Sequence, residues 1–208
     1  TIHITGVEHL NGCFTEVIPD RIEAGTYILA GSLCGNHLRI ENIIPKHLES
    51  LTSKLREMDV PFSFEFDSLV ISRGDHLKAT NIETAVYPGF PTDLQQPFMV
   101  LLTRAEGTSV VEENIFENRF MQVPYLQKMG ANIQVNGTKA IIQGGTPLSG
   151  CEVVATDLRA GASLVLAALS TPGEVTIIDN VEHILRGYEN IVEKLQEVGA
   201  MIELIEED

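Results

Sequence analysis

One unit recurs three times along the 208-residue chain, and this internal repeat constrains the fold more than any other feature. Each copy has a polar start, an apolar run, a glycine followed by an alternating run, and a segment that ends in a shared sequence. The shared endings begin at leucines that subtraction places 71 and 69 residues apart, namely Leu55, Leu126 and Leu195. A second landmark keeps a similar spacing of 72 and 66 residues, at Gly35, Gly107 and Gly173. Agreement at two separate landmarks indicates three structural copies of one unit.

The periodicity of each copy predicts a helix, a strand, a second helix and a pair of strands, which is an α/β organisation. Asp20 with Glu23, and Thr92 with Gln95, have the spacing of capping boxes that open the first helix. Pro97 falls about five residues into the helix of the second copy, where proline removes a backbone donor. We therefore expect that helix to start irregularly.

The second helices are expected to end at Gly130 and Gly199, because a glycine in the left-handed conformation commonly ends a helix. Alternating runs then predict strands at 62–66 with 69–72, 133–135 with 140–143, and 201–205. Asn136-Gly137 predicts a hairpin turn in the middle copy. Three such units can close around a pseudo-threefold axis with their apolar first helices packed inside.

We expect one three-repeat domain at 13–208, with repeats at about 13–76, 77–148 and 149–208. Residues 1–12 precede the first copy and are expected to be a strand and connection from another domain. The sequence begins at Thr1 without a methionine, as if within a strand. It is therefore expected to be part of a longer chain.

The net charge of −15 disfavours nucleic acid and anionic membrane as general partners. No apolar run approaches the roughly 20 residues of a membrane span, and the start does not resemble a signal peptide, so we expect a soluble protein. Three widely spaced cysteines without a CxxC pair favour a reduced, cytoplasmic location, and we expect them to be small buried side chains. They are Cys13, Cys34 and Cys151.

Charged residues gather at matching junctions of the copies. Asp20, Asp93 and Asp157 stand at the starts of the first helices, where an ordinary capping role explains them equally well. Arg21 and Arg159 lie near the same positive helix ends, where an arginine makes sense if an anion binds between them. Arg119 and Arg186 occupy the strand-to-helix connections of copies two and three, and each arginine alone could also be a solvated surface residue.

Other chemistries lack their motifs. The six histidines show neither HxxxH nor HxH spacing, so no metal site is predicted, and no cofactor is predicted either. The sequence contains no GxGxxG, no GxxxxGK[ST] and no GxSxG. Carboxylates beside guanidiniums remain, and they favour general-base chemistry on a hydroxyl next to a bound polyanion.

Five stretches in collinear order resemble the UDP-N-acetylglucosamine enolpyruvyl transferase family (UDP-N-acetylglucosamine 1-carboxyvinyltransferases). They are IPDRIEAGT from Ile18, FPTDLQ from Phe90, FENRFM from Phe116, ATDLRA from Ala155 and RGY from Arg186. The resemblance spans essentially the whole chain. It implies the enolpyruvyl transferase (EPT/RTPC-like) fold, with two domains of three repeats each and substrates in the cleft between them. The missing N-terminal domain would then be a partner of this chain, which alone would be inactive.

The resemblance implies transfer of the enolpyruvyl group of phosphoenolpyruvate to the 3-hydroxyl of UDP-N-acetylglucosamine, the first committed step of peptidoglycan synthesis. It implies that Asp93 contacts that hydroxyl as the general base, that Ile115 holds the sugar through its backbone, and that Asp157 lies near the reacting centre. The residues implied to surround phosphoenolpyruvate are Arg119, Arg159 and Arg186, and candidates for cleft or domain-closure contacts are Arg21 and Glu23.

Two departures and two alternatives accompany this interpretation. The family's catalytic cysteine, its lysine and most residues that contact UDP belong to the other half, and no cysteine here matches that motif. Pro97 stands where the family usually has glutamine or another helix former, close to Asp93. A 3-phosphoshikimate enolpyruvyl transferase shares the fold, and a non-catalytic repeat domain used for binding is the alternative from another class.

Overall fold

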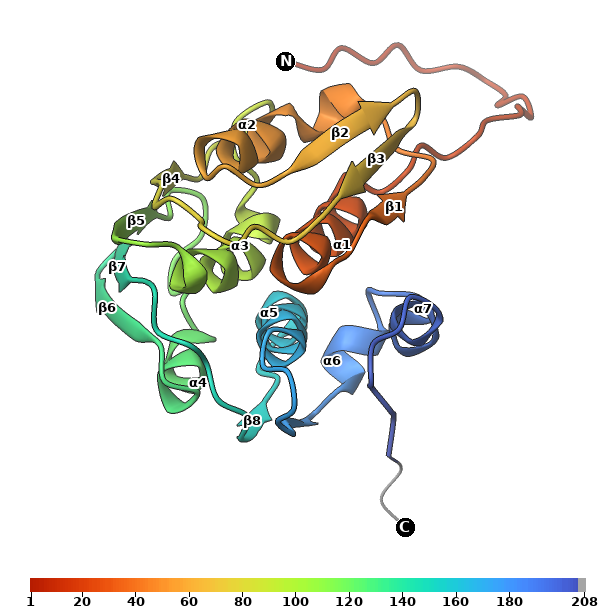
Figure 1. The fold of residues 1–208 in the computed structure, drawn as a ribbon. Coiled ribbons are helices and arrows are strands. Elements are labelled where there is room, and N and C mark those ends of the chain that lie inside the picture. Colours follow the sequence, from red (N-terminus) through yellow and green to blue (C-terminus); the bar gives the residue numbers. More distant parts are fainter. Residues whose placement is uncertain (206–208) are drawn as a thin grey trace.

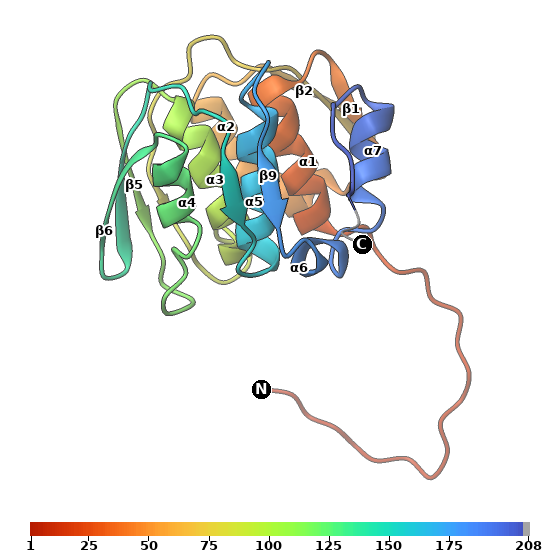
Figure 2. The same ribbon diagram turned by 90° about the horizontal axis from the view of Figure 1, so that it is seen from below.

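Three central helices organise the computed structural model, which describes residues 1–205; the last three residues of the predicted third repeat lie outside the described residues. These helices are α1 (Arg21–Cys34), α3 (Thr92–Arg104) and α5 (Leu158–Leu169). Figures 1 and 2 show them side by side, and each contacts the other two. In α3, every residue from Leu94 to Thr103 is buried, which places this helix in the middle of the core.

Three small sheets cover the helices on three sides (Figures 1 and 2). The first is antiparallel in the order β1-β3-β2, with β1 (Leu38–Ile40), β2 (Phe62–Glu65) and β3 (Ser68–Ile71). The second has the order β4-β5-β7-β6, with β4 (Ile82–Glu83), β5 (Thr108–Glu112), β6 (Asn132–Asn136) and β7 (Lys139–Gln143). The third is a parallel pair, β8 (Glu152–Val154) and β9 (Ile177–Asp179). Buried and exposed residues alternate along β7, so one face of its sheet packs on the core.

The remaining helices follow the strand that comes after each central helix, namely β1, β5 and β9. They are a 3-10 helix (Pro45–Leu48) with α2 (Glu49–Glu57), α4 (Val123–Lys128), and α6 (Glu182–Leu185) with α7 (Ile191–Glu197). Among the described residues, no helix has both the length and the apolar composition that crossing a membrane requires.

The shared sequence ending corresponds to one repeated backbone structure. In each copy the leucine carbonyl accepts an N–H five residues later at 2.9 Å, from Val60, Ala131 and Ala200. The residue before each donor has positive φ, at Asp59, Gly130 and Gly199. This geometry satisfies carbonyls that the helix end leaves open. The predicted left-handed conformation of the two glycines is confirmed.

The third copy departs from the predicted order of helices and strands. Residues 201–205 were expected to form a strand, but they form neither helix nor strand. In the first two copies the two final strands pair with each other, β2 with β3 and β6 with β7. A strand is stable only with a hydrogen-bonded neighbour. Within the described residues, segment 201–205 has no such neighbour, and the strand prediction is wrong for that reason.

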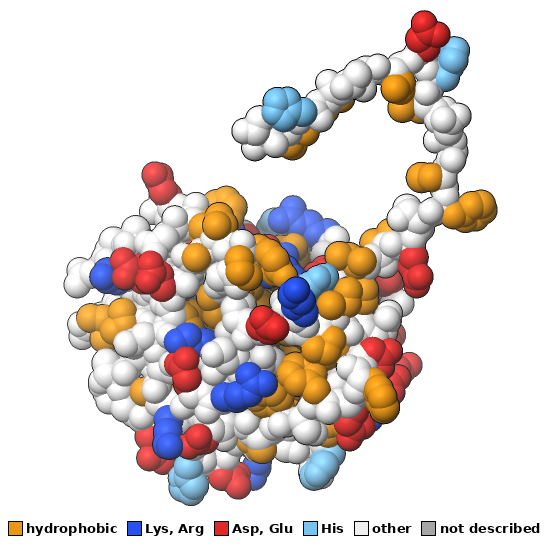
Figure 3. Space-filling model, turned by 90° about the horizontal axis from the view of Figure 1, so that it is seen from above, with side chains coloured by type: hydrophobic (Ala, Val, Ile, Leu, Met, Phe, Trp, Pro, Cys, Tyr) orange, Lys and Arg blue, Asp and Glu red, His pale blue; other side chains and the backbone are white. Residues whose placement is uncertain are grey.

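The N-terminal segment also differs from expectation. Residues 1–20 contain no strand, although a strand was expected within residues 1–12. The segment extends away from the globular body, and Figure 3 shows its apolar side chains uncovered. The most exposed of these large side chains are Phe14, Leu10, Val17 and Ile4. An alternating segment without a neighbouring edge has no ladder to join, so the pattern alone does not make a strand.

Three local predictions need adjustment. Asp20 caps α1 by accepting from the N–H groups of Ile22 and Glu23, but Glu23 forms an ion pair with Lys194 instead of completing a capping box. The predicted hairpin between β6 and β7 is present, with residues 137–138 as its two-residue turn, one position later than expected. The cysteines are not buried: two are exposed and Cys151 is intermediate.

Candidate functional site

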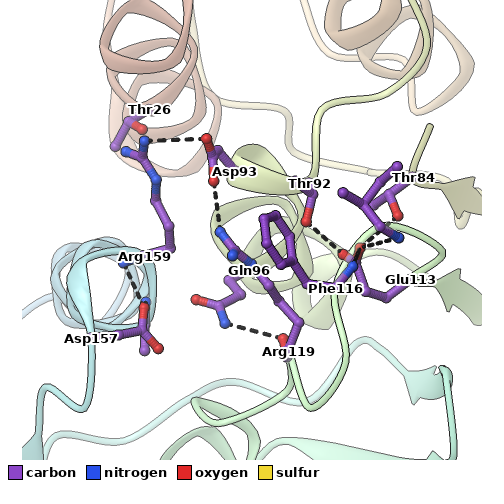
Figure 4. Close-up of polar contacts among 12 residues, drawn as sticks. Thr26, Thr84, Thr92, Asp93, Gln96, Glu113, Phe116, Arg119, Asp157 and Arg159 are labelled. Carbon is purple, nitrogen blue, oxygen red and sulfur yellow. Dashed lines mark hydrogen bonds and ion pairs between the residues drawn. The ribbon is translucent and has the colours of Figure 1, made fainter. Parts of the chain in front are cut away.

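An acidic side chain between two arginines lies at the start of α3. Asp93 stands in the first turn of that helix, and its Oδ1 lies 2.6 Å from Nη2 of Arg119. Its Oδ2 lies 3.4 Å from Nη2 of Arg159, which belongs to the first turn of α5 (Figure 4). The three side chains are only 36%, 19% and 17% exposed, in that order. Two cations therefore share one carboxylate in a half-buried position, where charges are screened less than in water.

The packing of the central helices explains why these residues meet. The first turns of α3 and α5 supply Asp93 and Arg159, and the connection from β5 to α4 supplies Arg119. Helix N-termini carry partial positive charge and free N–H groups. Together with two guanidiniums they form an environment that attracts anions. We call Asp93, Arg119 and Arg159 the central cluster.

A chain of hydroxyl groups holds Arg159. Its Nη1 donates to the Tyr188 hydroxyl at 3.1 Å, and Tyr188 lies 2.9 Å from Oγ1 of Thr26. Thr26 donates its proton to the carbonyl of Ile22, so the Tyr188 hydroxyl is the donor toward Thr26. Burial works to lower the pKa of Arg159, but Tyr188 and Asp93 outweigh burial and raise that pKa above its usual value. The Arg159 guanidinium is therefore held in position and stays protonated.

Arg119 is held from two sides. Its guanidinium carbon lies 4.6 Å from the centre of the Phe116 ring, within the range of a cation–π interaction. Its backbone carbonyl accepts from Nε2 of the buried Gln96 at 3.0 Å. Its Nε is buried and, within residues 1–205, has no hydrogen-bond partner. This N–H is therefore a buried donor that the described residues leave unsatisfied.

Two other predicted site residues have backbone roles in this structure. Asp157 is the N-cap of α5, and its Oδ1 accepts from the N–H groups of Arg159 at 2.8 Å and Ala160 at 2.9 Å. Ile115 is partly exposed, and its N–H donates to Glu113. Both residues therefore lie one short segment away from the central cluster, and neither makes a side-chain contact with Asp93 among the described contacts.

Arg186 and Glu23 lie beside an adjacent depression of about 520 Å³, which Tyr188 also lines. Glu23 is paired with Lys194 at 2.8 Å, from the helix α7. Arg186 follows α6 directly and forms no ion pair among the described residues. Because Tyr188 contacts Arg159 and lines this depression, Arg186 is a neighbour of the central cluster and not a member of it.

Arg21 points to a different place. Its guanidinium carbon lies 5.2 Å from the centre of the Tyr87 ring, and both residues line a smaller depression of about 380 Å³ together with His47. The central cluster lines neither of these two depressions. The ion pairs and hydrogen bonds of Asp93, not the shape of the surface, single out the candidate site.

Several residues that hold the site were not recognised in the sequence. Thr92 was predicted to cap α3, but the helix already begins at Thr92, and its hydroxyl donates to Glu113 (Figure 4). The roles of Gln96 and Tyr188 depend on partners far away in the sequence, which no local motif records. Helix α3 continues without a break through Pro97. In its first turn the N–H of Leu94 donates to the carbonyl of Pro91, three residues earlier, so this turn is wound more tightly than an α-helix.

Comparison with known proteins places this chain in a family. A family model described as EPSP synthase (3-phosphoshikimate 1-carboxyvinyltransferase) matches residues 1–195. UDP-N-acetylglucosamine 1-carboxyvinyltransferase 2 of Listeria monocytogenes serotype 4b (strain F2365) is 52% identical over 202 residues, which are 97% of this chain and 48% of that protein. UDP-N-acetylglucosamine 1-carboxyvinyltransferase of Koribacter versatilis (strain Ellin345) is 55% identical over 207 residues, which are 100% of this chain and 48% of that protein. The chain thus spans about half the length of the curated relatives it matches.

Solved structures agree on the fold. The enolpyruvyl transferase NikO from Streptomyces tendae superposes with a TM-score of 0.80 at 33% identity, covering 88% of this chain and 44% of that one. EPSP synthase from Acinetobacter baumannii gives a TM-score of 0.70 at 19% identity, covering 89% and 46%, and supports the fold alone. The predicted enolpyruvyl transferase fold is confirmed. The chain belongs to the EPSP synthase (3-phosphoshikimate 1-carboxyvinyltransferase) family.

Proposed function

We propose that the complete protein transfers the enolpyruvyl group of phosphoenolpyruvate to the 3-hydroxyl of UDP-N-acetylglucosamine in the cytoplasm, for peptidoglycan synthesis. This chain supplies one domain of that enzyme, at 13–208, and residues 1–12 connect it to the other. The names of relatives above 50% identity support this acceptor over 3-phosphoshikimate. The observation that carries the proposal is a carboxylate held between two guanidiniums, 2.6 and 3.4 Å away.

The reaction consists of an addition and an elimination. In the addition, the 3-hydroxyl oxygen bonds to C2 of phosphoenolpyruvate, its proton passes to Asp93, and C3 receives a proton from an acid in the other half. In the elimination, a base takes a proton from C3, the double bond between C2 and C3 re-forms, and the C2–O bond breaks so that its electron pair leaves with phosphate. A sugar hydroxyl is a far weaker acid than a carboxylic acid of pKa about 3.9, so proton transfer must accompany attack on C2.

The arginines suit the anionic partner. Phosphoenolpyruvate carries a carboxylate and a phosphate, which planar guanidiniums bind with paired hydrogen bonds. Arg119 also offers a buried Nε–H that no described residue uses. Charge builds up on the leaving phosphate during elimination, and fixed cations in a closed site stabilise that charge. Arg186, from its place beside the Tyr188 depression, would complete the anion site when the domains close.

The same two arginines also pair with Asp93 in this structure. Both carboxylate oxygens are paired, one with Arg119 and the other with Arg159. An arriving phosphate would compete for these guanidiniums and free a carboxylate oxygen to accept the hydroxyl proton. Binding of the anion would thus prepare the base.

The other predicted site residues have supporting roles in this proposal. Ile115 would hold the sugar through its backbone, and Asp157 would orient groups near the reacting centre while it caps α5. Arg21 and Glu23 would contact the other domain at closure. Tyr87 and Lys194 hold these two side chains in the structure described here.

A substrate comparison tests the proposal. The chain is combined with the half that its curated relatives carry in addition, and phosphate release from phosphoenolpyruvate is measured with UDP-N-acetylglucosamine or 3-phosphoshikimate as acceptor. We expect release with the nucleotide sugar only, and none from the 208-residue chain alone. Release with 3-phosphoshikimate only would assign the shikimate reaction. No release with either acceptor would favour a non-catalytic binding domain.

A further inference from the structure

Glu113 is a buried acid that the sequence gives no reason to single out. It directly follows β5 and is only 1% exposed. Its Oε1 accepts from the Thr84 hydroxyl at 2.9 Å and from the N–H groups of Ile115 at 2.9 Å and Phe116 at 3.1 Å. Its Oε2 accepts from the Thr92 hydroxyl at 2.9 Å (Figure 4). Four neutral donors thus use the lone pairs that a carboxylate offers.

The proton directions around Glu113 are fixed by a neighbouring bond. The Thr84 hydroxyl accepts from the N–H of Asn114 at 2.8 Å, so its single proton points to Glu113. The two backbone N–H groups can only donate. A buried carboxylate is costly to desolvate unless hydrogen bonds compensate it. Every hydrogen bond described for the Glu113 side chain is donated to its carboxylate, which holds that side chain in a well-defined position.

These bonds connect the two partners of the central ion pair. Thr92 immediately precedes Asp93 on α3. Phe116 lies under the guanidinium of Arg119, which is the partner of Asp93 at 2.6 Å. Glu113 therefore ties the helix end that carries Asp93 to the loop that carries Arg119, without touching either side chain in the described contacts.

Among residues 1–205, the same bonds leave Ile115 with one unpaired backbone group. Its N–H is used by Glu113, so its carbonyl is the group that it can offer to a ligand. An acceptor at this place would select a ligand that presents an O–H or N–H donor. This deduction concerns the orientation of the 115–116 segment, which Glu113 sets through two adjacent N–H groups.

We propose that Glu113 is a positioning residue that sets the distance between Asp93 and Arg119 and turns the Ile115 carbonyl toward the acceptor substrate. The proposal rests on the proposed function. A purely structural acid would affect folding alone, whereas a positioning residue affects turnover in a folded protein. Small displacements of reacting groups are enough, since about 1 Å can cost about 100-fold in rate.

The first test breaks one bond with little change of shape. In the complete protein, Thr92→Val removes the Oε2 donor and Thr92→Ser keeps it. The matched control is Thr108→Val on β5, which loses a hydroxyl bond to Gln143 Oε1 at 2.7 Å away from the cluster. We expect Thr92→Val to lower kcat about 10- to 100-fold with a smaller change in KM for phosphoenolpyruvate, and Thr92→Ser to restore most of the rate. Wild-type kcat in Thr92→Val would overturn the proposal.

The second test does not depend on activity. In Glu113→Ala, the amides of Ile115 and Phe116 should exchange hydrogen at least about tenfold faster, because each loses its acceptor. Amides of α1 serve as the control for global folding, and Glu113→Gln replaces the alanine variant if that control fails. In Glu113→Gln a neutral amide oxygen, which is a weaker acceptor than a carboxylate, can still bind the two N–H groups, so these amides should exchange faster than in wild type but more slowly than in Glu113→Ala. Unchanged exchange in Glu113→Ala with α1 protected would refute the positioning role.

The two readouts separate the possible failures. If the wild-type complete protein releases no phosphate, the proposed function fails, and amide exchange still decides whether Glu113 holds the 115–116 segment. If the segment loosens in Glu113→Ala but a wild-type enzyme and its Thr92→Val variant turn over equally fast, the proposed function stands and the positioning role falls.

Discussion

Two tyrosines with buried hydroxyl groups offer opposite stability predictions from the same substitution. The Tyr188 side chain is 1% exposed, and its hydroxyl donates to Thr26 and accepts from Arg159. The Tyr27 hydroxyl is also buried, but it has no hydrogen-bond partner among the described residues. Burial is the first cause that raises the pKa of Tyr27, followed by the nearby Glu23. Tyrosine-to-phenylalanine changes therefore remove two bonds at one position and none at the other.

The magnitudes follow from the bonds that are lost. A neutral hydrogen bond is worth about 1 kcal/mol net and one from a charged donor about 1.5–3 kcal/mol. Arg159 keeps Asp93 as a partner in Tyr188→Phe. We therefore expect the free energy of unfolding to fall by about 2 kcal/mol. For a chain of this length that lowers Tm by about 4–8 °C. In Tyr27→Phe an unsatisfied polar group disappears, so stability should stay equal or rise by up to about 1 kcal/mol.

The assay is urea unfolding of the 208-residue chain and its two variants, followed by circular dichroism and tyrosine fluorescence. Coincident transitions from both probes are required before the free energies are compared. The reasoning predicts that only Tyr188→Phe loses stability. Equal losses of unfolding free energy in both variants would refute the reasoning, because the hydrogen bonds that link Thr26, Tyr188 and Arg159 would then not contribute to stability.

Two further predictions concern packing and pH. Gly25→Ala should cost about 1–3 kcal/mol of unfolding free energy, because the new Cβ would lie 2.5 Å from Cδ1 of Leu94 where α1 meets α3. The control Gly12→Ala places its Cβ in open space and should cost nothing measurable. Equal Tm values for the two variants in calorimetry would contradict this prediction. Hydrogen bonds from Lys54 and Thr80 lower the pKa of Glu57 in the folded protein. The ionised Glu57 side chain therefore stabilises the fold above its ordinary pKa of 4.5, and this stabilisation is lost as pH falls through the lowered value. Glu57→Gln should therefore be less stable than wild type near pH 7 and converge with it below pH 4.5, and a stability difference that grows on acidification would be incompatible with that sign.

The repeat allowed the fold to be anticipated, because its landmarks are local in sequence. The bond from each shared leucine carbonyl to an N–H five residues later depends on a six-residue ending that is legible in all three copies. The failures come from partners that are distant. Residues 201–205 alternate like a strand, but an alternating pattern does not show whether a neighbouring strand exists.

The candidate site was anticipated through its charged residues and not through their supports. Helix starts drew attention to Asp93 and Arg159, and a matching junction drew attention to Arg119. The buried acid Glu113 follows a strand and resembles any strand-end residue, since burial is decided by tertiary packing. It also takes the Thr92 hydroxyl that a local capping motif would have used, because a buried carboxylate is the stronger acceptor.

Phosphate release by the complete protein with Asp93→Asn tests the central claim most directly. This change removes the base while it keeps the size of the side chain and an oxygen for Arg119. General-base catalysis contributes about 10²- to 10⁴-fold, so kcat should fall by that factor while the variant stays folded and still binds phosphoenolpyruvate. Asp93→Ala should lose activity at least as completely. Phosphate release at the wild-type rate in either variant would contradict the assignment of Asp93 as the base between two anion-binding arginines.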